Sequence, residues 1–443
     1  MGCTCAAESK ENLTPNVRPK ETEGDVNQKN GEQYKKPEKA IDQEIFNKDS
    51  CKEITSSLPK RTETNLQSLK DLIKSKTEKS SPKEKSYITF LWICQNIDYD
   101  AQSYFAGRSV DVTPEGVFRN GKTVCSGYAR IYKDISTYIA LEVECVNCYA
   151  KGVGYQPGQK MNSTNHEYNV IKLNNKWYPI DSTWGAGHIE GRDFKREFNE
   201  FYFLADPELL IRSHFPENPQ WQLTKQKYSL DDFLKWPKID SYFFKYEFKK
   251  YIPETGEINL ASNNSQKFQL FVENIKQKNL TCNVFYLEGN CFNQQLNSEI
   301  VNLYEDKFEI DCIFNKKGKY KVEFYANDDG TNHMKGIMDY IVNVNNNAKE
   351  ELKFPHSYAG AKAVNIIEPM YDNLKSGSNI KFKIKSELET IIIIDKQWHY
   401  LNKNEQGFFE EEIKIENEKG KNVIVGKKNE NGGCSYLYTY CVV

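Results

Sequence analysis

The chain has 443 residues, a length that predicts about three domains, and its formal net charge is −2. A chain so close to neutral presents no overall field for nucleic acid, so no nucleic-acid partner is expected. No segment approaches the roughly 18 consecutive apolar residues needed to cross a membrane.

The first residues have the pattern of an acylated N-terminus. Gly2 is a candidate for myristoylation, and Cys3 and Cys5 are candidates for palmitoylation, although Ala6 stands where Ser or Thr is usual. No apolar segment of a secretory signal follows. Because two acyl chains attach a protein stably, we expect a cytoplasmic protein anchored to the cytoplasmic face of a membrane. The alternative is a flexible N-terminal segment whose cysteines are not acylated.

Residues 8–57 are mainly Lys, Glu, Asn, Gln and Thr, and positive and negative charges nearly balance. Such a stretch cannot bury enough apolar surface to offset its ordering entropy, so residues 1–57 are predicted to be an acylated, disordered segment. Helical spacing begins near Glu63, and a second helix is predicted after Ser81-Pro82. The apolar positions of the two helices are Leu66, Leu69, Leu72 and Ile73, then Tyr87, Phe90, Leu91, Cys94 and Ile97.

Cys125 lies in the segment Gly-Lys-Thr-Val-Cys-Ser-Gly-Tyr-Ala, directly before a run with helical spacing. The first turn of a helix favours an anion, because its N–H groups are unsatisfied and the helix dipole is positive there; this lowers the pKa of a thiol. Gly121 and Gly127 are expected to leave room for a substrate backbone. The helix is predicted from Tyr128, Ile131, Tyr132, Ile135, Tyr138 and Ile139.

Cys145 and Cys148 form the only CxxC pair among twelve cysteines. A zinc site of this type would need a second pair, and residues 143–149 have the pattern of a strand rather than a helix start. We therefore expect no metal and no cofactor, and mostly reduced thiols.

His166 and Asp181 are predicted to share one face of a hairpin. Residues 166–173 and 176–181 have strand patterns, and Asn174-Asn175 tolerates the positive φ of a two-residue turn. That turn places Asp181 opposite Tyr168, so His166 and Asp181 become diagonal neighbours roughly 7–8 Å apart at the backbone.

Cys125, His166 and Asp181 together supply a nucleophile, a base and a group that orients the base. Taken singly, each residue has an ordinary structural explanation: a buried small apolar residue, a surface histidine and a strand-ending turn. The order of the three, the helix-start position and the shared face favour a nucleophilic site.

These motifs resemble the Cys, His and Asp boxes of the transglutaminase-like superfamily and, more closely, of its kyphoscoliosis peptidase group. The resemblance extends to the segments 91–100 and 203–216 and to Trp221-Gln222-Leu223, and it covers about residues 58–240. It implies an α+β, papain-like core in which a helix-borne cysteine packs on an antiparallel sheet. It also implies Cys125 as nucleophile, His166 as base and acid, and Asp181 as the residue that orients the imidazole.

One departure concerns the residues after the histidine, where the family commonly has Ala-Trp and this chain has Glu167-Tyr168. We expect a more acidic rim beside the base and a smaller aromatic wall, which affects substrate preference more than catalysis. The oxyanion site is expected at the Cys125 N–H, with a side-chain partner that is Trp92, Tyr99 or Gln102.

Beyond about residue 240 the chain consists of short alternating strands, such as those around Phe268, Tyr320 and Tyr340. Lys317-Gly318-Lys319 recurs as Lys419-Gly420-Lys421, an offset typical of β-sandwich modules. We predict two Ig-like domains, at 241–347 and 352–443, after a transglutaminase-like domain at 58–240. They would recruit substrate or cytoskeletal protein partners; the alternative is that they only buttress the core.

The sequence therefore predicts a cysteine peptidase acting on protein substrates. The alternatives are a protein-glutamine transglutaminase, which would use the same three residues, and a non-catalytic scaffold at a membrane or the cytoskeleton. No Asp/Glu cluster has EF-hand spacing, which argues against a calcium-activated transglutaminase.

Overall fold

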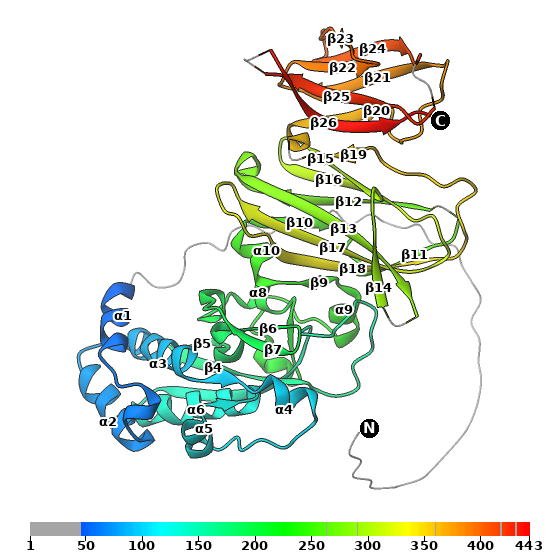
Figure 1. Cartoon of the computed structure of the whole chain (residues 1–443). Helices are drawn as coiled ribbons and strands as arrows, with labels where there is room; N and C mark the ends of the chain where they lie inside the picture. Colours follow the sequence, from blue (N-terminus) through cyan, green and yellow to red (C-terminus); the bar gives the residue numbers. More distant parts are fainter. Residues whose placement is uncertain (1–45, 263, 290, 359, 417–418, 430–431) are drawn as a thin grey trace, which may run out of the picture. The chain divides into compact units, whose positions relative to one another are not determined.

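The computed structural model describes residues 46–443 except 263, 290, 359, 417–418 and 430–431 (Figure 1). The candidate lipidation residues Gly2, Cys3 and Cys5 lie outside this range. Among the described helices, none combines the length and the apolar character that crossing a bilayer requires.

The segment expected to be a disordered spacer ends in a helix, α1 (Lys48–Ser56), so the prediction was wrong for this part. Asn47 caps the helix, and Cys51 is buried against the neighbouring helices. The Phe46 ring meets the Tyr87 ring edge-on, with centroids 5.1 Å apart. A few apolar residues suffice here because a tertiary surface receives them, and composition alone does not reveal such a surface.

Helix α1 is followed by the two helices that the apolar spacing predicted, α2 (Leu66–Lys76) and α3 (Pro82–Asn96). Ser81 and Glu84 form a capping box at the start of α3. Helix α3 is buried along most of its length, which makes it the central helix of this part of the chain. Two short helices follow, α4 (Ala101–Phe105) and α5 (Pro114–Asn120), together with the paired strands β1 (Asp98–Tyr99) and β2 (Lys122–Thr123).

An antiparallel sheet of order β5-β4-β3-β8 carries helix α6 (Cys125–Tyr138), which packs against β3 and β4. The predicted hairpin register is confirmed, because Leu173 pairs with Lys176 and Asn169 with Ile180. Asn174 and Asn175 form the turn at φ values of 48° and 62°. The strands of this sheet are β3 (Glu142–Ala150), β4 (His166–Leu173), β5 (Lys176–Ile180) and β8 (His214–Pro216).

Packing within the chain accounts for Gly121 and Gly127, which were expected to leave room for a substrate backbone. Gly121 ends α5 in the left-handed region, at φ 69°. A Cβ at Gly127 would lie 2.0 Å from Thr123 Oγ1, so this glycine lets α6 pack closely on β2. Both glycines are required by the packing of the chain itself.

Short elements complete the α+β part of the chain, residues 46–237. They include a two-stranded hairpin, β6–β7, which follows the helix after Asp181. These elements are α7 (Ser182–Ala186), β6 (Gly187–Glu190), β7 (Asp193–Arg196), α8 (Pro207–Leu210) and α9 (Leu230–Lys235).

The first β-sandwich has two sheets that share one core, of order β10-β12-β16-β15 and β11-β18-β17-β13-β14. Strand β9 (Lys238–Ile239) pairs with β18, so this sandwich begins before the predicted residue 241. Its other elements are α10 (Ser241–Lys245), β10 (Phe248–Ile252), β11 (Glu257–Leu260), β12 (Ser265–Val272), β13 (Lys278–Glu288), β14 (Cys291–Gln295), β15 (Glu299–Leu303), β16 (Lys307–Ile313), β17 (Gly318–Asp328) and β18 (Lys335–Val344).

The second β-sandwich has two sheets, both antiparallel, of order β19-β26-β25-β22-β23 and β20-β21-β24, around a core of its own. Lys267-Phe268, on β12 of the first sandwich, recurs as Lys381-Phe382 on β21 of the second. The strands are β19 (His356–Ser357), β20 (Val364–Glu368), β21 (Asn379–Ser386), β22 (Thr390–Ile394), β23 (Gln397–Tyr400), β24 (Phe408–Lys414), β25 (Asn422–Lys428) and β26 (Cys434–Cys441).

Candidate active site

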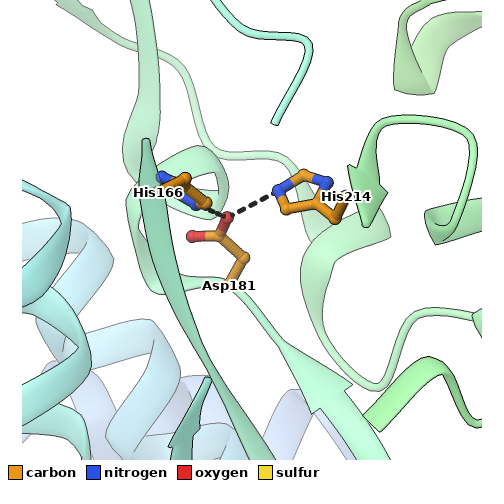
Figure 2. A group of neighbouring side chains, drawn as sticks. All are labelled: His166, Asp181 and His214. Carbon is orange, nitrogen blue, oxygen red and sulfur yellow. Dashed lines mark hydrogen bonds and ion pairs between the residues drawn. The ribbon is translucent and has the colours of Figure 1, made fainter. Parts of the chain in front are cut away.

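The hairpin brings His166 and Asp181 together, as the predicted register requires. His166 begins β4, and Asp181 directly follows β5 as the N-cap of α7. His166 Nε2 lies 2.6 Å from Asp181 Oδ2, and both side chains are buried (Figure 2). Because Nε2 faces the carboxylate, Nδ1 is the ring nitrogen left for the interaction with Cys125.

Cys125 is the first residue of α6, as predicted, and is half-buried. Burial raises the pKa of its thiol, but the hydrogen bond with His166, the charge of His166 and the Glu167 N–H outweigh burial, so the pKa lies below its ordinary value. A thiolate at this position has an imidazolium beside it and the N-terminus of a helix behind it.

The pKa of His166 is shifted in the complementary direction. Burial lowers it, but the charge and hydrogen bond of Asp181, followed by the contact with Cys125, raise it to about 10. The downward shift of the Cys125 thiol pKa and the upward shift of the His166 imidazole pKa both favour a thiolate–imidazolium pair.

The Asp181 carboxylate accepts four hydrogen bonds. Oδ1 receives the N–H groups of Thr183 at 2.8 Å and Trp184 at 3.0 Å, while Oδ2 receives His166 and, at 3.1 Å, His214 Nε2. Burial opposes ionisation, but the two histidines and their hydrogen bonds hold the pKa of Asp181 well below its usual range. The carboxylate is therefore ionised and fixed in orientation.

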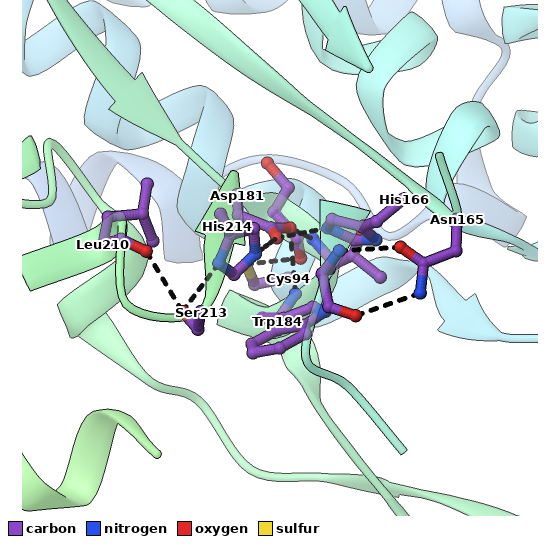
Figure 3. Close-up of polar contacts among 11 residues, drawn as sticks. Cys94, Asn165, His166, Asp181, Trp184, Leu210, Ser213 and His214 are labelled. Atoms are coloured by element: carbon purple, nitrogen blue, oxygen red, sulfur yellow. Dashed lines mark hydrogen bonds and ion pairs between the residues drawn. The ribbon is translucent and has the colours of Figure 1, made fainter. Parts of the chain in front are cut away.

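His214 is a member of this cluster that the sequence did not reveal. It lies on β8, which pairs with β3, and its Nδ1 lies 2.8 Å from Ser213 Oγ (Figure 3). Burial lowers the pKa of His214, although Asp181 opposes the shift. A neutral His214 that donates Nε2–H to Asp181 accepts the Ser213 hydroxyl proton at Nδ1. In the sequence, the only indication of a role for His214 was its position in segment 203–216, which is part of the resemblance described above.

Trp184 lies beside both histidine rings, at centroid distances of 5.6 Å from His166 and 4.4 Å from His214. Asn165, the residue before the base, exchanges two hydrogen bonds with the backbone of Ala150 on β3, at 2.7 and 3.0 Å. These contacts fix the start of β4 and hence the position of His166 (Figure 3).

His166, Asp181 and His214 offer three potential metal-ligand atoms within 4.8 Å of one another. Both Nε2 atoms, however, face the same oxygen, Asp181 Oδ2, at hydrogen-bond distances. These atoms therefore fit a hydrogen-bonded pair of His166 and Asp181, with His214 as a second hydrogen-bond donor to the carboxylate, better than they fit a metal centre.

The residues after the base do not form the rim that was expected. The Glu167 side chain hydrogen-bonds Cys145, and Tyr168 is buried with its ring 5.8 Å from that of His214. Successive residues of a strand point to opposite faces, so Glu167 points away from the side that carries His166. Trp184, rather than residue 168, lines the cavity beside the base.

The structure distinguishes among the three candidate oxyanion partners. Trp92 is buried and donates its indole N–H to Pro59 O at 3.0 Å, and Gln102 is exposed on α4. Tyr99 is half-buried near Cys125: burial and then the Cys125 charge raise the pKa of its hydroxyl. Only Tyr99 combines proximity to the thiol with a position on the wall of the cavity.

Comparison with known proteins shows which of them are similar to parts of this chain. A family described as "KY-like, immunoglobulin-like domain" matches residues 230–355, which includes β9. Kyphoscoliosis peptidase from Mus musculus is 28% identical over 271 residues, 60% of this chain and 39% of that protein. The Homo sapiens protein of the same name is 34% identical over 182 residues, 40% of this chain and 28% of that protein.

A third relative is Lim and transglutaminase domain protein ltd-1 from Caenorhabditis elegans, 29% identical over 147 residues, 30% of this chain and 20% of that protein. The matched regions thus span two fifths or less of each of these three relatives. Together with the α+β core and the sandwiches, the matches support a transglutaminase-like protein. Within that class they support the KY type, with a match to the KY-like, immunoglobulin-like domain after the core.

Proposed function

We propose that the chain is a thiol acyl-transfer enzyme, most specifically a cysteine peptidase acting on protein substrates. The observation that carries this proposal is the 2.6 Å contact between His166 and Asp181, with His166 hydrogen-bonded in turn to Cys125 at the start of α6. The name of the mouse and human relatives agrees with this class of reaction.

In the first half of the reaction, the Cys125 thiolate attacks the carbonyl carbon of a peptide bond. The C–N bond breaks as the His166 imidazolium gives its proton to the departing amine. In the second half, water attacks the thioester while His166 takes a proton from it, which releases the acid and restores the thiolate. Asp181 holds the imidazole and stabilises its charged form throughout.

The negative charge that develops on the carbonyl oxygen needs donors. The Cys125 N–H lies in the first turn of α6, where helix N–H groups have no intrahelical acceptor. We assign the Tyr99 hydroxyl as the side-chain donor because Tyr99 lies near the thiol and lines the cavity.

The proposal is tested by incubating the purified full chain with a denatured protein substrate and a fluorescent primary amine. New amino termini, read by mass spectrometry, are the expected product; incorporation of the amine at glutamine instead would identify a transglutaminase. Cys125→Ala should abolish the product, and Cys291→Ala should not, because Cys291 is an exposed cysteine of the first sandwich.

The proposal would be overturned if product formation survived in Cys125→Ala. Absence of both products, together with an ordinary, unactivated Cys125, would instead favour a non-catalytic scaffold.

A further inference from the structure

A cavity of about 380 Å3 adjoins the candidate active site. At one end it is lined by Tyr99 and His166, which are both neighbours of Cys125. It continues along the β6–β7 hairpin to the segment 238–242, and Lys335 of the first sandwich contributes to its wall. Its volume lies in the range of roughly 300–1,000 Å3 that is usual for ligand sites.

Aromatic and aliphatic side chains form much of this wall. Tyr99 and Tyr104 meet edge-on with ring centroids 5.9 Å apart, and Trp184 and Phe194 also line the cavity. Tyr104 and Val153 line it as well, and each has 46% of its surface exposed. Large apolar side chains left in water at the edge of a cavity are typical of a binding surface.

The charged groups at the far end are already paired with one another. Glu197 binds Lys335 at 2.6 Å and lies 3.5 Å from His188, while it also accepts the Tyr242 hydroxyl at 2.8 Å. A charged substrate side chain that enters the cavity would therefore lose its hydration. The charged residues of this group would not compensate, because they are already paired with one another.

The other ionisable groups of the wall are likewise engaged. Lys238 lies 3.6 Å from Asp339, and Asp240 accepts hydrogen bonds from the Ser241 hydroxyl and the Tyr242 N–H. Lys151 is buried and donates to backbone carbonyls, among them that of Trp236 at 2.8 Å. The wall of the cavity is thus apolar near the thiol, and at the other end its charged side chains are paired with one another.

We propose that this cavity is a substrate subsite that binds an uncharged aromatic or large aliphatic side chain, adjacent to the carbonyl that Cys125 attacks. The inference rests on the proposed function and names its substrate class: protein segments with a bulky apolar residue beside the bond that is cleaved. It also gives the first sandwich a role, since Lys335 helps neutralise the far end of the subsite.

The test measures how fast Cys125 of the full chain is alkylated by dipeptidyl chloromethyl ketones. Phe, Leu, Ala, Lys or Glu is placed at either position before the ketone, and each rate is divided by the rate with iodoacetamide. We expect the Phe and Leu reagents to exceed the Ala reagent by about tenfold or more at one position. The Lys and Glu reagents should not exceed the Ala reagent at that position.

Two variants at the mouth of the cavity sharpen the test. Tyr104→Ala and Val153→Asp should remove most of the preference for Phe when each rate is divided by that variant's own iodoacetamide rate. Tyr400→Ala is the matched control, because Tyr400 is an exposed tyrosine of the second sandwich, and it should keep the preference.

A preference for Lys or Glu, or no preference at all, would overturn the subsite if iodoacetamide labelling still depends on His166. Iodoacetamide labelling that ignores His166 would overturn the proposed function, and the subsite with it. The two failures are therefore distinguishable in one set of rates.

Discussion

Asp181→Asn tests the electrostatic design of the site, because it keeps the size of the side chain and removes the charge. Oδ1 of Asp181 accepts two backbone N–H groups, so the oxygen of the substituted amide side chain must stay at that position. The amide nitrogen must then replace Oδ2, where it faces the Nε2 atoms of His166 and His214. Since an amide nitrogen only donates, both imidazoles must present Nε2 as an acceptor.

The consequence for His166 is a neutral ring with its proton on Nδ1, toward Cys125, where it cannot accept the thiol proton. The lost hydrogen bond to a charged group is worth about 1.5–3 kcal/mol. At 1.36 kcal/mol per unit, the pKa of His166 should fall by about 1–2 units and the pKa of the Cys125 thiol should rise. Turnover should fall by about 10⁴-fold, the cost of the wrong tautomer in a comparable triad.

The assay is the rate of Cys125 alkylation against pH for the wild-type chain and for Asp181→Asn. Asp206→Asn is the matched control, because Asp206 is also an N-cap that accepts a backbone N–H, at the start of α8. A folded Asp181→Asn protein with the wild-type pH curve would refute the reasoning.

Three further variants test the packing and the charges around the site. His214→Ala should lower the free energy of unfolding by about 3–5 kcal/mol, because it removes a buried ring and a donor to Asp181; a loss below about 1 kcal/mol in urea unfolding followed by tryptophan fluorescence would contradict this. Gly127→Ala should cost about 1–3 kcal/mol in the same assay, since its Cβ would meet Thr123, and an unchanged midpoint would refute the close packing. The raised pKa of His166 stabilises the fold below about pH 6.5, and this contribution is lost as pH rises through about 10. The stability difference between the wild-type chain and His166→Gln should therefore shrink over that range, and a difference that grows with pH would contradict the sign.

Local sequence patterns were sufficient to predict the parts of the site that lie close together along the chain. The apolar spacing after Cys125 placed it at the start of α6, and the Asn174-Asn175 turn determined the hairpin register. The register in turn predicted the contact between His166 and Asp181, because side chains alternate along strands.

Features that depend on distant pairing could not be predicted in the same way. His214 reaches Asp181 because β8 pairs with β3, and neither a period nor a turn encodes that pairing. The orientation of Glu167 away from the base, and the packing of Gly127 on Thr123, are also set by neighbouring elements.

The cavity is a further example of a feature that only the folded chain reveals. Its wall combines Tyr99, Trp184, the β6–β7 hairpin and Lys335, which lie far apart in the sequence. Helix α1 illustrates the same limit, because its few apolar residues are stabilised by a surface that other segments build.

In the proposed mechanism, His166 holds Cys125 as a thiolate. The most direct test is the alkylation rate of Cys125 against pH in the wild-type chain and in His166→Ala, read by peptide mass spectrometry with exposed Cys291 as a reference in the same molecule. We predict fast labelling well below the free thiol pKa of about 8.5 in the wild-type chain, and its loss in His166→Ala. Slow labelling of Cys125 that follows the curve of an ordinary thiol and is the same in both proteins would contradict the account.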